Sequence, residues 1–316
     1  MTTTTLFSNP ECLLHDPGPE HPDRPERLRV ILQALEAPEF HALARGSGDR
    51  ADMRDVLLAH SAEYVDRVVQ AVPASGLRNI EADTVLCPAS LDAALRAAGL
   101  VCAAIDAVFA GRTTNAFCAI RPPGHHAERG HALGFCLLNN LAIGALHARR
   151  VHGARRLAMI DFDTHHGNGA QNIFWEDPET CLVSLHEHPS DIATGDSDEH
   201  GKYGTILNLP LPPGSGSAEF RSAFTNDLAP HVRRFRPDIL MVAAGFDGHR
   251  DDPVGRLCLD DADYFWIARA LRQLADECCG GRLVASLEGG YNLENLGRSV
   301  ASFVAGLYGQ PPTDIF

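Results

Sequence analysis

Short apolar runs alternate with longer helical patterns along most of the chain, and this alternation constrains the fold more than any other feature. Six runs have the length and composition of buried strands: Asn115–Ile120, Arg156–Asp161, Cys181–Leu185, Gly204–Leu209, Asp238–Ala243 and Arg282–Leu287. Helical periodicity marks seven other segments: Pro25–Leu35, His60–Val72, Leu91–Ala110, Leu137–Val151, Ala218–Phe235, Asp261–Cys278 and Glu294–Gly306. The alternation predicts an α/β fold in which helices cover both faces of a parallel sheet.

Nothing in the sequence divides this pattern into separate units. We find no internal repeat, low-complexity tract or charged linker, and the Pro- and Gly-rich stretch 211–216 lies within the alternation. A length of 316 residues suits one large α/β domain. We therefore expect residues 1–316 to form a single domain.

Charge and cysteine usage restrict the class of partner and the compartment. A formal net charge of −14 disfavours nucleic acid and anionic membranes, and favours cationic substrates that carry lysine or polyamine groups. The nine cysteines form no CxxC pair, which is typical of a reducing compartment. The N-terminus does not resemble a signal peptide, and no apolar run reaches membrane-spanning length. We expect a cytoplasmic protein that binds neither nucleic acid nor membrane; homo-oligomerisation stays open.

The residues after the predicted strand 156–161 carry the strongest chemical signal. Asp161, Asp163 and His165 alternate along the chain, so in an extended strand they would project to one side. Their oxygen and nitrogen donors suit zinc, and a catalytic zinc site keeps one coordination position for water. A strand end whose acids cap the next helix is the alternative explanation.

Three further polar clusters follow predicted strands. His125 and His126 lie on a loop that contains two prolines, and tandem imidazoles suit proton transfer near neutral pH. Asp247 could be a third zinc ligand, although a single Asp after a strand is usually a cap or turn residue. Tyr291 follows paired glycines, where its hydroxyl could donate to an oxyanion, although such a Tyr is more often structural.

Ligands of open α/β sheets bind beyond the carboxyl ends of the strands, so these clusters are expected to meet. Together they would form an amide hydrolase. Zinc would polarise the carbonyl and activate a water, a histidine would transfer the proton, and the tyrosine would stabilise the oxyanion. No GxSxG motif is present, which argues against a serine hydrolase of the α/β-hydrolase type.

Six motifs in chain order resemble the zinc-dependent histone deacetylase and acetylpolyamine amidohydrolase family: RPPGHHAE, GFCLLNN, DFDTHHGNG, SLHEH, GFDGHRDDP and LEGGY. The resemblance extends from about His21 to Gly306, and HHGNG and LEGGY are closer to the class II and bacterial branch than to class I. It implies one arginase-like catalytic domain with an eight-stranded, mainly parallel sheet.

The resemblance implies that Asp163, His165 and Asp247 bind zinc. An Asp/His/Asp set would accept iron(II) as well. The resemblance also implies a structural potassium ion, held in part by backbone carbonyls. Its ligands would be Asp161, Asp163, His165, Ser184 and Leu185.

Catalytic roles follow from the same resemblance. One of the tandem histidines, His125 or His126, would be the general base and also the general acid. Asp161 matches the partner of the first histidine and Asn168 the partner of the second. Tyr291 matches the tyrosine that stabilises the transition state, as expected of active deacetylases.

Four positions bear on the substrate. Gly134 and Phe135 match the wall of the substrate tunnel, and Arg27 matches an arginine below the site. Val254 stands where polyamine-selective relatives carry a glutamate, and an apolar residue there favours acyl-lysine over acetylpolyamine. The loop 187–195 lacks the aromatic residue that usually faces Phe135, so the tunnel is expected to admit longer acyl groups or non-peptide amines.

Three other functions are compatible with parts of this pattern. An acetylpolyamine amidohydrolase would agree with the acidic composition. A non-catalytic acyl-lysine binding protein would have lost a ligand, the base or the tyrosine, and none is missing. An arginase-type manganese hydrolase would need further Asp and His ligands for a second metal.

Overall fold

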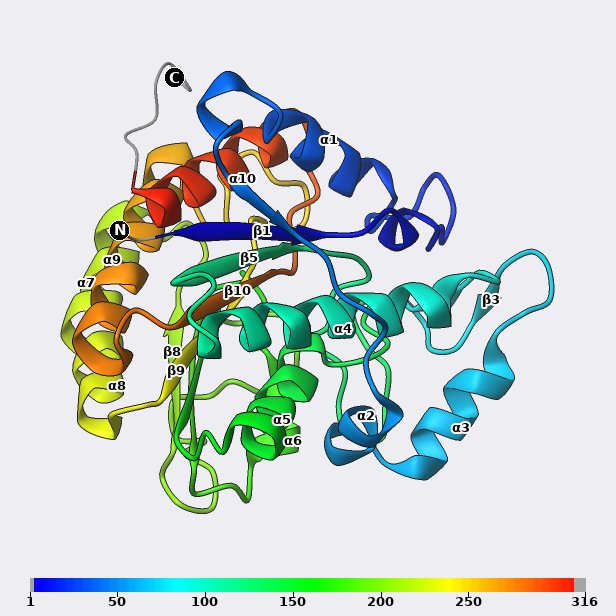
Figure 1. Cartoon of the computed structure of the whole chain (residues 1–316), viewed down its shortest axis with the longest axis horizontal. Coiled ribbons are helices and arrows are strands. Elements are labelled where there is room, and N and C mark those ends of the chain that lie inside the picture. The colour runs from blue at the N-terminus through cyan, green and yellow to red at the C-terminus, as the bar shows by residue number, and fades with distance from the viewer. Residues whose placement is uncertain (1–2, 310–316) are drawn as a thin grey trace.

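The computed structural model describes residues 3–309, which form one α/β domain around an eight-stranded sheet (Figure 1). The strand order is β2-β1-β5-β10-β9-β6-β7-β8, and each neighbouring pair is parallel. The strands are β1 Thr4–Ser8, β2 Ala44–Gly46, β5 Asn115–Ala119, β6 Leu157–Asp161, β7 Thr180–Glu187, β8 Ile206–Leu211, β9 Ile239–Ala244 and β10 Leu283–Leu287. The predicted fold class is confirmed, while the limits of the domain at 1 and 316 lie outside the described residues.

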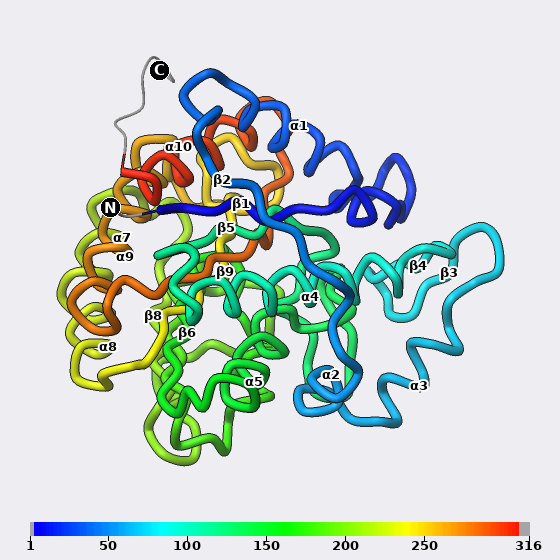
Figure 2. Tube along the Cα trace, viewed as in Figure 1, coloured from blue at the N-terminus to red at the C-terminus, as the bar shows by residue number. Residues whose placement is uncertain are grey.

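Helices cover the sheet on both sides (Figure 1). Helices α4 and α5 pack on one face, whereas α1, α9 and α10 pack on the other. The helices are α1 Glu26–Ala34, α2 Met53–Ala59, α3 Ala62–Ala71, α4 Ser90–Phe109, α5 Asn140–His152, α6 Asn168–Phe174, α7 Ser217–Ala223, α8 Ala229–Phe235, α9 Asp261–Cys279 and α10 Leu293–Tyr308. A short antiparallel ribbon of β3 Arg78–Asn79 and β4 Val85–Leu86 lies beside α3 at one rim of the molecule (Figure 2).

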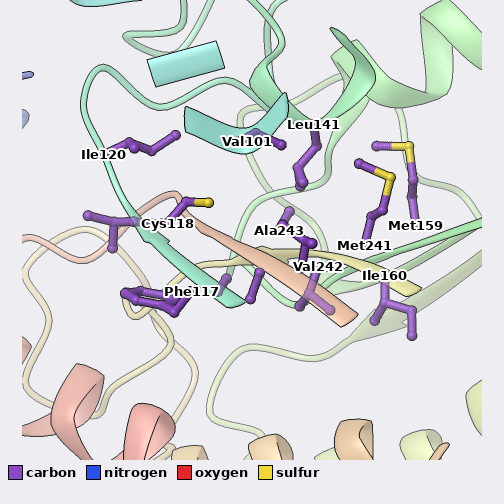
Figure 3. Packing of buried hydrophobic residues seen from close by; sticks show 14 of the residues in the cluster. Val101, Phe117, Cys118, Ile120, Leu141, Met159, Ile160, Met241, Val242 and Ala243 are labelled. Carbon is purple, nitrogen blue, oxygen red and sulfur yellow. The ribbon is translucent and has the colours of Figure 1, made fainter. Parts of the chain in front are cut away.

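Alternation along the central strands builds the two halves of the core. Met159 and Met241 point toward α4 and α5, whereas their neighbours Ile160 and Val242 point to the opposite side (Figure 3). All four are buried, and so is Phe117 of β5 beside Phe303 of α10. Both faces of the sheet are therefore apolar, which explains why these strands are nearly continuous hydrophobic runs.

Two predicted helices differ from the observed ones for local reasons. The segment predicted to be helical from Leu137 begins at Asn140, because the Asn139 side chain caps it and accepts a hydrogen bond from Ala142 N at 3.0 Å. The segment predicted as one helix over 218–235 is divided by a π-helix at Phe224–Leu228. Pro230 follows this turn and has no N–H for an ordinary helical bond.

The strand order brings distant parts of the chain to one edge of the sheet. Strands β5, β10, β9 and β6 are consecutive neighbours, so the four loops after them leave the same edge side by side. These loops carry the polar clusters named above. None of the helices within residues 3–309 has the length and apolarity needed to cross a membrane.

Candidate active site

The three predicted metal ligands converge beyond β6 and β9. Asp163, His165 and Asp247 each offer one ligand atom, and these atoms lie within 4.8 Å of one another. His165 Nδ1 is 3.1 Å from Asp163 Oδ1 and 3.0 Å from Asp247 Oδ2. Ligands about 2.0–2.2 Å from a tetrahedral zinc lie about 3.4 Å apart, so this donor set fits the ion in chemistry and in spacing.

Surrounding backbone orients both carboxylates. Gly289 N donates to Asp163 Oδ2 at 2.8 Å, and Thr164 N donates to Asp247 Oδ1 at 3.0 Å. A Cβ on Gly289 would lie 2.4 Å from Asp247 Oδ2 and 2.6 Å from Asp163 Oδ2. Only a glycine lets the β10 loop approach these carboxylates so closely. Such outer contacts fix the ligands and tune a bound metal.

The path of the chain after β6 corrects one expectation. β6 ends at Asp161, so Asp163 and His165 are not in an extended strand and its alternation does not align them. Asp161 Oδ1 instead accepts a hydrogen bond from Asp163 N at 3.0 Å, and Asp163 Oδ1 accepts one from His165 N at 2.9 Å. These two successive turns bring Asp163 and His165 together and leave Asp161 facing His125.

The tandem histidines lie beside the metal-ligand cluster, and each is paired as predicted. His125 Nδ1 lies 3.0 Å from Asp161 Oδ2, and His126 Nδ1 lies 2.7 Å from Asn168 Oδ1. Asn168 Nδ2 donates to Glu128 Oε1 at 2.8 Å, which fixes the orientation of the amide. The carbonyl of Asn168 therefore faces His126, so Nδ1 of that ring is the donor and its Nε2 can accept a proton.

The two imidazoles have opposite proton affinities. Burial disfavours charge on His125, but the carboxylates of Asp163 and Asp161 outweigh it and raise the pKa of His125 to about 10. Burial, reinforced by the charges of His125 and His165, lowers the pKa of His126 well below its ordinary value. Titratable neighbours whose environments separate their pKa values suit different roles, and here His126 is the neutral ring.

Tyr291 is held by groups on both sides of its turn. Its N–H donates to Asp252 Oδ2 at 2.7 Å, and the Arg27 guanidinium lies 4.8 Å from the centre of its ring. Arg27 also donates to Gly290 O at 2.5 Å and pairs with Asp23 at 2.6 Å. Burial raises the pKa of the Tyr291 phenol well above 10, so the hydroxyl remains a donor.

Several supporting residues were not identified from the sequence. Glu288 Oε2 accepts hydrogen bonds from Gly124 N at 2.7 Å and His125 N at 3.1 Å, and so fixes the histidine loop. Asp252 Oδ1 accepts from Val254 N at 2.9 Å, so one carboxylate joins the Val254 turn to the Tyr291 turn. Both acids lie inside the quoted motifs, where Glu288 precedes the paired glycines and Asp252 precedes a proline, and this was the available signal.

The structure places the predicted tunnel residues beside the base and the phenol. Gly134 has φ +54°, and a Cβ there would lie 2.2 Å from His126 Cδ2, so the position requires glycine. The Phe135 ring has centroid distances of 5.8 Å to Tyr291 and 4.6 Å to His21. His21, which we did not assign to the tunnel, therefore flanks Phe135. Val254 is 40% exposed at the surface.

Three of the five proposed potassium ligands lie on neighbouring strands, whereas Asp163 and His165 lie in the loop after β6. Asp161 of β6 and Ser184 of β7 are register partners, and Leu185 follows Ser184. The Ser184 hydroxyl is 2.9 Å from His186 Nδ1 and thus already has a polar partner. The potassium site stays a prediction.

Comparison with known proteins gives one consistent result. Residues 21–307 match the family described as the histone deacetylase domain. The chain is 40% identical to histone deacetylase 14, chloroplastic, from Arabidopsis thaliana, covering 92% of this chain and 73% of that relative. It is 34% identical to the histone deacetylase-like amidohydrolase of Pseudomonas aeruginosa, with 92% and 82% covered.

A human relative and a solved structure agree with this result. The polyamine deacetylase HDAC10 of Homo sapiens is 35% identical, with 98% of this chain and 47% of that relative covered. The crystal structure of the HDA15 HD domain superposes with a TM-score of 0.92 at 33% identity, covering 99% of this chain and 91% of that one.

Proposed function

Since the chain belongs to the histone deacetylase family and is a hydrolytic deacetylase, we propose that it removes acyl groups from acylated amines, with acyl-lysine as the preferred substrate. The observation that carries this proposal is the juxtaposition of three metal-ligating side chains with a neutral, oriented His126. The substrate amine is either a lysine of a protein or peptide, or a small acylated amine.

We propose that Asp163, His165 and Asp247 bind zinc, with iron(II) as the alternative ion. Their donor chemistry and spacing support this assignment. When bound, such an ion polarises the substrate carbonyl and lowers the pKa of its water. A two-metal, arginase-type site has less support, because among the described residues at these strand ends only Asp163, His165 and Asp247 group as metal ligands.

His126 is the proposed general base and acid. Its Nδ1–H is directed to Asn168, so Nε2 takes the proton of the attacking water and returns it to the leaving amine. His125 keeps its own proton because Asp161 and Asp163 stabilise its charged form. Tyr291 donates to the oxyanion from a turn held by Arg27 and Asp252.

The residues at the entrance support acyl-lysine over acetylpolyamine. Val254 is apolar and exposed, and gives a secondary ammonium no counter-ion at that position. A polyamine preference is the alternative, since one relative is named a polyamine deacetylase. The absence of Phe, Tyr and Trp from the loop 187–195 supports a tunnel that accepts acyl groups longer than acetyl.

The test is a substrate panel with zinc-loaded protein: peptides carrying acyl-lysine of increasing chain length, and N-acetylputrescine. We expect the acyl-lysine peptides to be the better substrates. We expect His126→Ala and Tyr291→Phe to lower turnover strongly, by about 10²–10⁴-fold for His126→Ala, while zinc content is unchanged, because neither residue is a proposed ligand. Exposed His41, changed to Ala, is the matched control. Undiminished turnover in either site variant would reject the mechanism, and a strong polyamine preference would reject the role of Val254.

The remaining expectations also stay proposals. We propose that the enzyme acts in the cytoplasm, although two plant relatives are named chloroplastic. A structural potassium ion and a homo-oligomer are compatible with the structure and have no direct support in it.

A further inference from the structure

A second group of metal-ligating side chains lies on the helical layer, away from the strand tips. Asp106 is on α4, and His147 and His152 are on α5; we call these three residues the helix-layer cluster. Their ligand atoms lie within 4.8 Å of one another. Asp106 Oδ1 is 2.9 Å from His147 Nε2 and 2.6 Å from His152 Nε2.

This geometry parallels that of the candidate catalytic metal site. There, His165 Nδ1 is 3.0–3.1 Å from two carboxylate oxygens. The helix-layer cluster has one carboxylate and two imidazoles at comparable spacing. Zinc binds three such protein ligands and leaves a fourth position for water. Asp106 and His152 are partly exposed, so solvent can reach that position.

His147 lies between two carboxylates. Nδ1 is 2.9 Å from Asp55 Oδ2, and Nε2 is 2.9 Å from Asp106 Oδ1, so each nitrogen faces a carboxylate. An imidazolium would donate to both carboxylates, whereas a neutral imidazole has a single N–H and can donate to only one of them. With a metal at Nε2, the Nδ1–H of the neutral ring would still donate to Asp55. This carboxylate–histidine–metal arrangement is the usual support of a metal-binding histidine.

Neighbouring contacts hold this arrangement in place. Asp55 is buried and accepts hydrogen bonds from Arg150 at 2.6 and 2.8 Å, so its charge is balanced without a metal. The His152 ring stacks on Phe109 at 4.7 Å, with the planes 6° apart. Cys102 also lies near Asp55 and His147, but burial raises the pKa of its thiol, and Arg150 disfavours a cation on that side.

We propose that Asp106, His147 and His152 form a second binding site for a divalent transition metal of the zinc type, with Asp55 orienting His147. The ion would join the last turn of α5 to α4. The proposal is independent of the catalytic assignment, because no residue is shared between the two clusters.

The test is zinc stoichiometry measured by elemental analysis after saturation and desalting. We expect two zinc ions per chain in the unmodified protein. Asp106→Asn and His152→Gln should each retain one zinc and full deacylase activity, whereas Asp163→Asn should also retain one zinc but lose activity. His41→Gln, at an exposed histidine, should retain two.

A second measurement covers variants that fold poorly. In the Asp163→Asn protein, added zinc should raise the melting temperature, because a ligand that binds the folded state stabilises it. The rise should disappear when His152→Gln is added. The proposal would be overturned if the unmodified protein held one zinc and Asp163→Asn lost it. A rise in melting temperature that persists in the double variant would also overturn it. If Asp163→Asn instead keeps all the zinc of the unmodified protein, the assignment of zinc to Asp163, His165 and Asp247 fails, and the proposal for the helix-layer cluster does not.

Discussion

The two Asp/His clusters use the same donor atoms in different surroundings. Around Asp163 and Asp247, backbone amides and a closely approaching glycine orient the carboxylates, and a neutral imidazole and a phenol lie next to them. Around Asp106, the neighbours are an arginine-balanced carboxylate and a stacked phenylalanine. The comparison teaches that ligand geometry provides metal binding, whereas reactivity depends on what faces the open coordination position.

The largest expected difference between the clusters is in catalysis. His126→Ala should lower kcat/KM by about 10²–10⁴-fold, the usual range for general acid–base catalysis. His152→Ala should change kcat/KM by less than about twofold, because its ring contacts Asp106 and Phe109 and not the tunnel. Steady-state kinetics on an acyl-lysine peptide measures both. Similar losses in the two variants would remove the distinction.

The next expected effect is a loss of folding stability at acid pH that depends on His60, a buried histidine outside both clusters. His60 Nδ1 lies 2.9 Å from Glu128 O, and Nε2 accepts from Asn139 N at 2.9 Å, so the ring is held neutral. Burial lowers the pKa of His60 from 6.5 to about 4. The unfolded chain therefore binds more protons between pH 6.5 and 4, and stability is complete above pH 6.5 and declines through this window.

From pH 7.5 to pH 5 the decline due to His60 should be about 2 kcal/mol in the free energy of unfolding. Urea titrations of metal-free protein and of His60→Gln at both pH values measure it. The variant should show the smaller pH dependence, and equal dependence would show that His60 titrates normally.

A substitution at Gly289 tests the close approach of this glycine to the carboxylates of Asp163 and Asp247, which the helix-layer cluster does not share. Gly289→Ala should weaken zinc retention by about 10–100-fold, because the new Cβ would displace both carboxylates. Gly153→Ala is the control at the helix-layer cluster. Gly153 has φ +66° with nothing near its Cβ, so this change should cost about 1–2 kcal/mol of stability and leave catalytic zinc in place. Zinc analysis and melting curves separate the outcomes, and full zinc retention in Gly289→Ala would contradict the expectation.

The smallest expected effect is at Asp252, which positions Tyr291 from behind. Asp252→Asn should lower kcat by about tenfold with KM nearly unchanged, because it loosens the turn that carries the phenol without touching the substrate. Asp252→Glu should restore part of the rate. A change confined to KM would indicate that the residue acts at the entrance through Val254 instead.

The sequence predicted the central strands well. Each strand is buried on both faces, and its residues therefore form a continuous apolar run. It did not predict β2, whose residues Ala44–Gly46 are largely exposed and are held only by pairing with β1. Strand β1 also escaped notice, since its threonine-rich sequence has no distinct apolar run. Position relative to a neighbouring strand, rather than composition, defines such segments.

In the candidate site, too, the sequence predicted some features and missed others. Strand ends and motif order were enough to group the metal ligands with the tandem histidines. The side-chain directions of Asp161 and Asp163 depend on turns inside the loop, which residue alternation does not describe. The helix-layer cluster was not visible in the sequence, because its contacts depend on how α4 and α5 are aligned with each other.

The contact of Arg27 with Gly290 joins residues separated by 263 positions in the chain. The phenol-bearing turn thus receives its support from a segment that is synthesised long before the turn itself. A nascent chain released before residue 290 has its tandem histidines and the proposed metal ligands but lacks Tyr291, the proposed donor to the oxyanion. Partial translation products should therefore be unable to deacylate, whatever metal they acquire.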